Sequence, residues 1–288
     1  GKYIDERRTK IIKGGVKEIS DEDLVPEKET MLVLTAGGYV KCTDPSEYRA
    51  QKRGGVGVID LETKEEDFVT MLVSGSTHSN LLFFTNLGKV YQMKMYDIPE
   101  ARRATRGKSI MNFLSLSAEE KVTSILAMSK NLNERHTSLM LVTKNGTAKK
   151  MSSESFKDVR RSGIIAIRLD KNDQLISALM TEKGDEVMIA TTDGQSIRFK
   201  ESDVREMGRT AGGVTGIKLK KSDQVIGVDV VKKSGEKSAF LTMSANGFGK
   251  KTNLKEYKVQ KRGGSGVKTA KVTSKTGKLI VAKVLGGE

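Results

Sequence analysis

Cysteine and histidine are scarce in this chain of 288 residues, with Cys42 as the only cysteine and His78 and His136 as the only histidines. A single cysteine excludes an intrachain disulfide framework and a thiolate metal cage. Neither histidine lies in a closely spaced cluster of Asp, Glu or Cys, so no metal site is predicted. We interpret His78 as a loop residue between strands and His136 as part of an inserted turn.

Motifs that carry catalysis are also missing. The sequence has no nucleophile elbow, no Walker A loop and no paired-carboxylate motif. Its glycine-rich segments lack the strand–loop–helix setting that a dinucleotide or P-loop site requires. We therefore expect no catalytic residue, no metal and no cofactor here, and a free-standing enzyme is the least favoured class.

Long apolar runs are absent as well. The longest, such as Met31–Leu34 and Leu81–Phe84, have the length of strands and cannot span a bilayer. The polar segment Gly1–Lys13 has no apolar core of the kind found in signal peptides. With the single cysteine, this favours a cytoplasmic location and no membrane partner. The missing initiator Met indicates a part excised from a longer protein.

Positive charge, by contrast, is abundant. The chain carries 51 Lys and Arg against 36 Asp and Glu, which gives a net charge of +15 and a pI near 9.7. Such an excess points to an anionic partner, with nucleic acid first and a membrane surface second. A generically basic protein is the remaining explanation on composition alone.

One sequence phrase occurs five times: an apolar run, a hydroxyl residue, two further residues and a glycine. Its copies span residues 31–38, 81–88, 139–146, 187–194 and 240–247. Each apolar run predicts a strand buried on both faces. The Asn-Gly and Asp-Gly pairs at the ends of the later copies predict hairpin turns in which glycine takes the left-handed conformation. A second strand then follows.

Two more strands are predicted in each unit. A Gly/Val/Ile-rich segment, such as 164–169 or 213–219, is followed by a strand that closes the unit. Acidic or amide residues precede most closing strands and are interpreted as turns. The predicted closing strands cover residues 68–73, 122–128, 174–180, 224–231 and 279–285.

Four strands per unit of about 50 residues are typical of an all-β, propeller-like radial array. We predict a single domain, 1–288, with residues 1–30 as a lead-in segment and linker. The five repeats cover about 31–80, 81–138, 139–186, 187–238 and 239–288. A sixth repeat is absent or incomplete, and the sequence leaves open whether the array has five blades or lacks its last one.

Each repeat also contains a loop of cations and glycine, within residues 47–57, 101–108, 156–163, 204–213 and 255–266. These windows hold 16 basic and four acidic residues, and so carry a net +12 of the chain's +15. Equivalent positions in radial repeats fall on one rim, so the loops predict a curved basic stripe. That shape suits duplex DNA, whose phosphates give affinity without sequence readout. The candidate rim residues are Arg49, Arg102, Arg103, Arg106, Lys108, Lys157, Arg160, Arg161, Arg205, Arg209, Lys258, Lys261 and Arg262.

The strongest candidate segment is the heptamer Gln-Lys-Arg-Gly-Gly-Val-Gly at 51–57, with a near-copy at 260–266. Its glycines allow positive φ and close approach to a partner, and its cations supply charge for an anionic one. The candidate binding residues of the first copy are Gln51, Lys52, Arg53, Gly54, Gly55, Val56 and Gly57.

This heptamer resembles the box, Q-(R/K)-R-G-G-(R/K)-G, in the C-terminal domain of the DNA gyrase A subunit. Residues 38–41 and 48–51 are similar to the first blade of that family, and residues 203–211 to its fourth. Residues 82–85, 98–102 and 104–107 resemble the second blade. The resemblance runs from about Arg7 to the end of the chain.

The resemblance implies a β-pinwheel, a propeller-shaped ring in which neighbouring blades exchange strands. It implies a domain that wraps double-stranded DNA around its rim, so that the whole enzyme introduces negative supercoils with ATP. The implied partners are the gyrase B subunit, together with the N-terminal catalytic part of the gyrase A subunit. ATP, Mg²⁺ and the cleavage tyrosine would then lie outside this chain, which is non-catalytic on its own.

The sequence departs from the family pattern at the sixth position of the box, where Val56 replaces the usual cation and removes one expected phosphate contact. The second copy has Ser265 there and is a second candidate anchor. Two alternatives stay open: the equivalent domain in the A subunit of topoisomerase IV, and a propeller-like scaffold that binds proteins.

Overall fold

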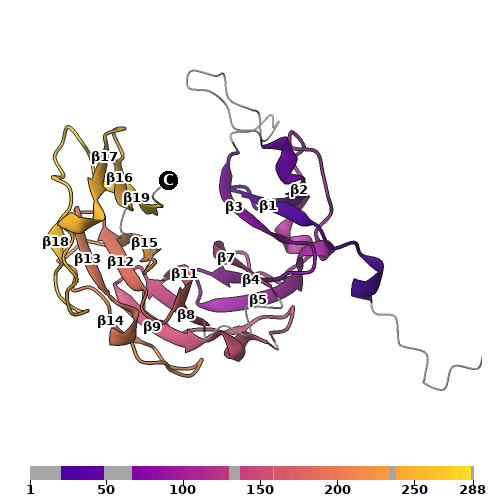
Figure 1. Ribbon diagram of the computed structural model, residues 1–288, viewed down its shortest axis with the longest axis horizontal. Helices are drawn as coiled ribbons and strands as arrows, with labels where there is room; N and C mark the ends of the chain where they lie inside the picture. The colour runs from indigo at the N-terminus through magenta and orange to yellow at the C-terminus, as the bar shows by residue number, and fades with distance from the viewer. Residues whose placement is uncertain (1–20, 49–66, 130–136, 158, 234–237, 287–288) are drawn as a thin grey trace, which may run out of the picture.

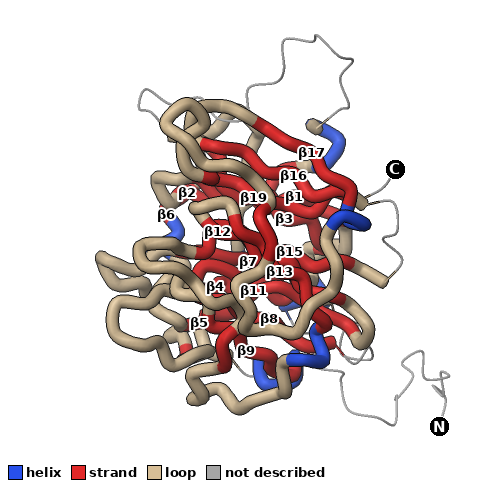
Figure 2. The backbone as a smooth tube through the Cα atoms, turned by 90° about the vertical axis from the view of Figure 1, so that its left-hand side faces the viewer, coloured by secondary structure: helices blue, strands red, loops and turns tan. Residues whose placement is uncertain are grey.

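The computed structural model describes residues 21–48, 67–129, 137–157, 159–233 and 238–286, and these form five sheets arranged as blades along an open arc (Figure 1). The regular structure in these ranges is strands and short 3-10 turns (Figure 2). The prediction of an all-β array with five repeats is confirmed. No helix in the described ranges is long and apolar enough to cross a membrane.

Each blade is built around a first strand with a second strand on one side and a closing strand on the other. The first strands are β1 (Glu29–Thr35), β4 (Asn80–Thr85), β8 (Thr137–Thr143), β12 (Glu186–Thr191) and β16 (Ala239–Ser244). The second strands are β2 (Tyr39–Thr43), β5 (Lys89–Lys94), β9 (Thr147–Ser152), β13 (Gln195–Lys200) and β17 (Gly249–Asn253). The closing strands are β3 (Val69–Ser76), β7 (Val122–Met128), β11 (Leu175–Glu182), β15 (Val225–Val231) and β19 (Leu279–Leu285).

The hairpins between first and second strands form where the repeated glycines predict them. The five turn glycines have φ between +74° and +87°, a region that favours glycine because it has no Cβ. Three of these turns are stabilised by an acidic side chain that precedes the closing strand and accepts a hydrogen bond from a backbone N–H of the turn. Asp67 accepts from Gly37, Asp173 from Asn145 and Asp223 from Asp193, at 2.8–3.0 Å.

The fourth strand of a blade comes from the next repeat along the chain. These donated strands are β6 (Lys108–Ser109), β10 (Ile164–Ile165), β14 (Val214–Thr215) and β18 (Val267–Lys268). They pair with β2, β5, β9 and β13 respectively. This is the strand exchange that the resemblance implies. The prediction that the third strand of each unit lies within its own blade is therefore wrong. The donated strands are also only two residues long.

The fifth blade differs because the described residues supply no donor to β17. Its sheet has three strands, in the order β17-β16-β19. The residues of β17 are mostly exposed, whereas the second strands of the other blades are largely buried. The predicted first strand of this blade is confirmed as β16. The prediction that this strand is buried on both faces is wrong, since Met243 is exposed.

The closing strands line the inner side of the arc and the donated strands its outer edge (Figure 1). Neighbouring closing strands lie against one another from β3 to β19, and apolar side chains fill the space between the blades. Cys42 belongs to this core. It is 2% exposed, and burial raises the pKa of its thiol to about 12, so it is a packing residue.

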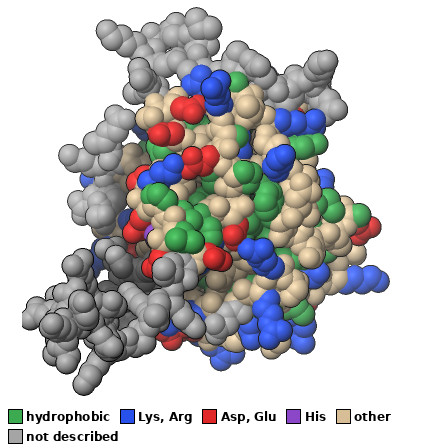
Figure 3. Space-filling view, turned by 90° about the vertical axis from the view of Figure 1, so that its right-hand side faces the viewer, with side chains coloured by type: hydrophobic (Ala, Val, Ile, Leu, Met, Phe, Trp, Pro, Cys, Tyr) green, Lys and Arg blue, Asp and Glu red, His purple; other side chains and the backbone are tan. Residues whose placement is uncertain are grey.

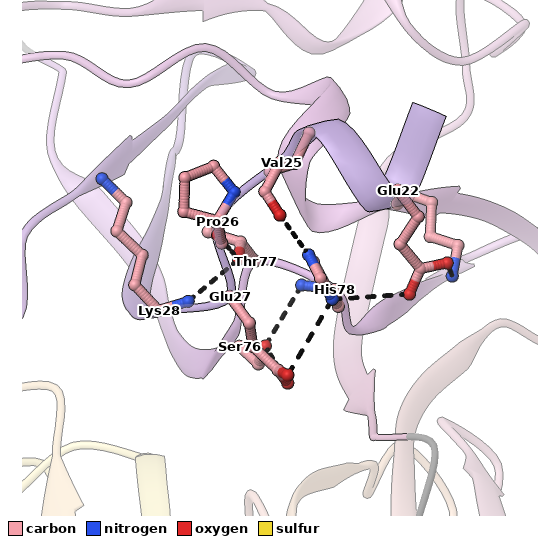
Figure 4. A network of polar contacts seen from close by, with 9 residues as sticks. Glu22, Val25, Pro26, Glu27, Lys28, Ser76, Thr77 and His78 are labelled. Carbon is pink, nitrogen blue, oxygen red and sulfur yellow. Dashed lines mark hydrogen bonds and ion pairs between the residues drawn. The ribbon is translucent and has the colours of Figure 1, made fainter. Parts of the chain in front are cut away.

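The segment before β1 is docked on blades 1 and 2 through the β3–β4 turn (Figure 4). The Nε2 atom of His78 lies 2.7 Å from the carbonyl oxygen of Val25, and its Nδ1 lies 3.6 Å from Glu22 Oε1. The Thr77 hydroxyl donates to the Pro26 carbonyl at 2.8 Å. His78 lies between strands, as predicted, and its contacts give it a structural role. His136 lies outside the described residues.

Candidate nucleic-acid interface

Four of the five predicted cationic loops are described, and they lie at the outer rim because each of them leads into a donated strand. Residues 101–107 precede β6, 159–163 precede β10, 204–213 precede β14 and 257–266 precede β18. The loop of one repeat therefore covers the outer edge of the preceding blade. Four loops from four successive repeats follow the convex side of the arc (Figure 1).

Glycine just before each donated strand permits the close approach that strand exchange requires. Gly107, Gly163, Gly213 and Gly266 all have positive φ. A Cβ at Gly107, Gly213 or Gly266 would lie 2.3–2.7 Å from a carbonyl oxygen of the preceding blade. At Gly163 it would lie 2.5 Å from the ring of Tyr91. These glycines thus serve the packing of one blade on the next.

Consecutive rim segments are joined by backbone hydrogen bonds. Arg168, just past β10, donates its N–H to the carbonyl of Ala211 in the next loop at 3.3 Å. In the same way, Lys218 donates to Gly264 at 2.9 Å, and Gly263 donates back to Gly216 at 2.6 Å. The spacing between these loops is therefore set by the fold rather than by long side chains.

Most predicted rim cations in the described ranges are exposed. Seven have side chains with no hydrogen bond or ion pair to another described residue. They are Arg102, Lys108, Arg160, Arg205, Arg209, Lys258 and Lys261. They come from four repeats, and each loop contributes at least one of them. A row of free cations on a convex edge is suited to phosphates spaced along a polyanion.

Five other predicted cations are engaged in contacts within the protein. Arg103 donates from Nη1 to the Glu47 carbonyl at 2.8 Å, and the Arg106 guanidinium lies 3.7 Å from the centre of the Tyr39 ring. Arg262 donates to the carbonyls of Asp203 and Thr215 at 2.8 and 3.1 Å. The remaining two form ion pairs, Lys157 with Glu154 and Arg161 with Asp97.

The first heptamer, Gln51–Gly57, and Arg49 lie outside the described residues. Their assignment as binding residues remains a prediction. The second heptamer is described. Lys261 in it is exposed, while Arg262 spans the rim loops of two repeats.

Sequence reasoning missed a second row of cations. Arg168, Lys218 and Lys271 are exposed, and each lies four residues after the start of a donated strand. The loop windows ended at the glycines and so excluded them. Comparing the residues that follow the third strand of each repeat would have found this row.

Two lysines lie beneath the rim, with almost no exposure. Lys41 of β2 is 1% exposed, and its ammonium donates to the carbonyls of Arg103 and Thr105. Lys149 of β9 is 0% exposed and donates to the carbonyls of Arg209 and Ala166 at 2.6 and 2.7 Å. Burial lowers the pKa of Lys149 to about 8, because desolvation disfavours its charged form.

The basic character is not uniform over the molecule. On the side of blade 1, acidic and basic side chains are interspersed with apolar ones (Figure 3). Within the described ranges, no group of three or more His, Cys, Asp or Glu residues is placed to hold a metal ion.

The fold and the rim together define a propeller-like array of strand-exchanging blades with a basic outer edge. The family model described as DNA gyrase C-terminal domain, beta-propeller, matches residues 29–73, 79–127, 137–182, 185–232 and 239–285. The chain belongs to this family. The five matched segments correspond to the five blades.

Curated relatives agree with this assignment. The chain is 40% identical to the DNA gyrase A subunit of Staphylococcus epidermidis over 212 residues, which are 74% of this chain and 24% of that protein. It is 44% identical to the DNA gyrase A subunit of Clostridium acetobutylicum over 210 residues, 73% of this chain and 25% of that protein. The match spans about a quarter of the length of these relatives.

Solved structures show the same architecture. A DNA gyrase A C-terminal domain aligns with a TM-score of 0.74 and 28% identity, covering 90% of this chain and 83% of that one. The C-terminal domain of a DNA topoisomerase IV aligns with a TM-score of 0.73 and 25% identity, covering 91% and 79%.

Proposed function

We propose that this chain binds duplex DNA along its outer rim and is the DNA-wrapping part of a gyrase A subunit. The observation that carries the proposal is the row of free cations on four successive loops of the convex edge. Phosphate contacts of this kind give affinity through counterion release and need no base readout. The predicted box, 51–57, would add further phosphate contacts.

Continuous contact around a convex edge bends the bound duplex. Bending by tens of degrees over a few helical turns costs several kcal/mol, on the order of 1–6. Many contacts are needed to offset that cost, and a rim to which successive repeats each contribute cations supplies them. The backbone bonds between loops keep the contacts at a constant spacing while the DNA is held.

In the whole enzyme, this bending would present a second DNA segment to the catalytic part in one handedness. Negative supercoiling with ATP would then depend on the gyrase B subunit, together with the N-terminal part of the A subunit. This chain would work in the cytoplasm, on the chromosome, without catalytic residues or cofactors of its own. ATP and Mg²⁺ would be used elsewhere in the assembly.

A topological assay tests wrapping. Relaxed circular DNA is incubated with the chain and a nicking-closing topoisomerase, and its linking number is measured after deproteinisation. We expect superhelicity of one sign that grows with the protein-to-DNA ratio. An unchanged linking number at saturating protein would contradict wrapping.

A pair of charge-matched variants tests the rim. Arg205→Gln with Arg209→Gln removes two free rim cations, whereas Lys121→Gln with Lys183→Gln removes two exposed cations from turns next to the inner strands. We expect only the first pair to lower the slope of log affinity against log salt, by about 0.9 per lost contact. No retarded species in a gel shift at physiological salt would instead favour a protein-binding scaffold.

The equivalent role in topoisomerase IV is the second candidate, favoured by the structural match to that enzyme's C-terminal domain. The box at 51–57 favours gyrase. The linking-number assay separates the two, since a domain that binds DNA without wrapping it leaves the linking number unchanged.

A further inference from the structure

Lys149 and Lys41 occupy the same place in two blades. Each lies on the second strand, one residue past the position that pairs with the donated strand at Ala148 or Val40. Each donates to the carbonyl of the arginine five residues before that donated strand, Arg209 or Arg103. The two ammonium groups therefore hold the cationic loop of the next repeat from below.

The same place is filled differently in the other complete blades. In blade 2 it is Tyr91, whose hydroxyl donates to Glu120, and in blade 4 it is Ile197. Both side chains are buried, so the fold accepts an aromatic or an aliphatic residue there. A buried lysine is thus not required for the blade to form. Burial of a charged lysine costs desolvation energy, so the presence of lysine at this place in blades 1 and 3 needs a reason other than folding.

We propose that Lys149 and Lys41 are positioning residues for DNA binding, which hold the loops of Arg209 and Arg103 by their carbonyls and add buried positive charge beneath the rim. The inference rests on the proposed function. Arg209 is exposed, and its guanidinium has no described partner. Its backbone carbonyl is held by the buried ammonium of Lys149, which fixes the position of the residue while its side chain faces solvent. Protonated Lys149 forms stronger, charge-assisted bonds than a neutral amine.

The surroundings of Lys149 contain no acidic partner for its charge among the described residues. The adjacent strands β8 and β14 carry no charged residue. The rim segments over it contribute Arg168, Asp170 and Lys171 from one repeat and Arg205, Glu206 and Arg209 from the next, and these are exposed. Its neighbour Lys150 is paired with Glu201 at 2.6 Å. A bound polyanion would add negative charge on the rim side of Lys149, where cations outnumber the carboxylates of Asp170 and Glu206.

Linkage then fixes the sign of the pH effect. A partner that stabilises the charged form of a group raises the pKa of that group, and it binds more weakly once the group is deprotonated. Since the Lys149 pKa is about 8 in the free protein, DNA affinity should fall as the pH rises through 8.

The test uses Lys149→Met, which keeps the length of the side chain, and Lys149→Ile, which places in blade 3 the residue that blade 4 carries. Lys183→Met, in the exposed turn between β11 and β12, removes the same charge away from the rim and is the control. We expect the Lys149 variants to bind a duplex roughly fivefold or more weakly, and to lose the fall in affinity between pH 7 and 9. The control should retain both the affinity and the pH profile.

A second measurement uses the unaltered chain, so that a folding defect in the variants does not decide the matter. The Lys149 side chain is followed by NMR during pH titration, with and without a saturating duplex. A raised pKa in the complex supports the proposal. An unchanged pKa, or variants with native affinity and native pH profile, would overturn it while the proposed function stands. Absence of duplex binding by the unaltered chain would overturn the proposed function itself.

Discussion

Glycine at the residue scale combines two roles in this protein, a left-handed backbone and close packing on a neighbouring repeat. The turn glycine Gly146 has positive φ for the hairpin, and an added Cβ there would lie 2.7 Å from the Ile217 carbonyl oxygen. The glycines before the donated strands also need both positive φ and the absence of a side chain. At Gly213, with φ of +98°, an added Cβ would lie 2.7 Å from the Ala148 carbonyl oxygen and 2.8 Å from Thr147 Cγ2.

Gly213→Ala should therefore destabilise the protein by about 1–3 kcal/mol, because the left-handed backbone and the clash with the preceding blade add together. Gly208→Ala is the matched control in the same loop. Gly208 has no positive φ, and no heavy atom lies within 4 Å of the position that an added methyl group would take. Urea unfolding of both variants checks the difference, and equal midpoints would contradict the packing role.

Buried lysines mark the limit of residue-level prediction from the sequence. An alternating strand pattern assigns Lys41 and Lys149 to the surface, since lysine is rarely fully buried. The structure places both inside because their carbonyl partners come from loops about 60 residues away. An alignment of the repeats would have revealed the burial of both lysines, because the equivalent residues Tyr91 and Ile197 indicate that this position faces inward.

At the scale of the strand and loop, the rim depends on contacts between successive repeats. Arg262 extends from the loop of the fifth repeat to carbonyls of the fourth, so its guanidinium is already occupied by the protein. Arg205, at the same edge, has no described partner. Two arginines that look alike in the sequence thus differ in what they stabilise.

Arg262→Met should lower the free energy of unfolding by about 1–2 kcal/mol, since two charge-assisted hydrogen bonds to carbonyls are lost. Arg205→Met should leave stability within about 0.5 kcal/mol and reduce the salt slope of DNA binding by about 0.9. Denaturant unfolding and salt-dependent binding are measured on both variants. Loss of stability in Arg205→Met alone would reverse the assignment.

Element prediction succeeded where a strand carries its own periodicity or a turn its own glycine. First, second and closing strands have five to eight residues, and most have an apolar pattern from which their positions follow. The strand β17 has no apolar residue and is located by the turn glycine Gly247 before it. A donated strand has two residues and no periodicity, and its partner is set by packing on another repeat. The residues alone therefore predicted a strand but not its place, which came from the family resemblance.

For the whole molecule, the exchange makes each blade depend on the repeat that follows it. Blades 1 to 4 have their second strand covered by a donor, whereas β17 of blade 5 has none within the described residues. The outer edge of blade 5 should be the least protected of the five. The last blade is thus the most exposed to local opening.

Hydrogen exchange checks this ranking. Amides of β17 should exchange faster than those of β13, which pairs with β18. In a chain ended after Lys233, β13 loses both its donor and the support of β19 on β15, and its exchange should become as fast as that of β17 in the intact chain. Protection of β13 that is unaffected by the truncation would show that the blades are independent.

The offset between repeat and blade also bears on how such a chain changes length during evolution. Every donor attaches to the second strand before it, by the same register at Tyr39–Val40 and at Gln195–Ser196. If recombination removes one whole internal repeat, the donor of the following repeat meets an equivalent acceptor, and no blade inside the array is left incomplete. Duplication works in the same way. Blade number, and with it the length of the rim, can therefore vary by whole units without a new interface.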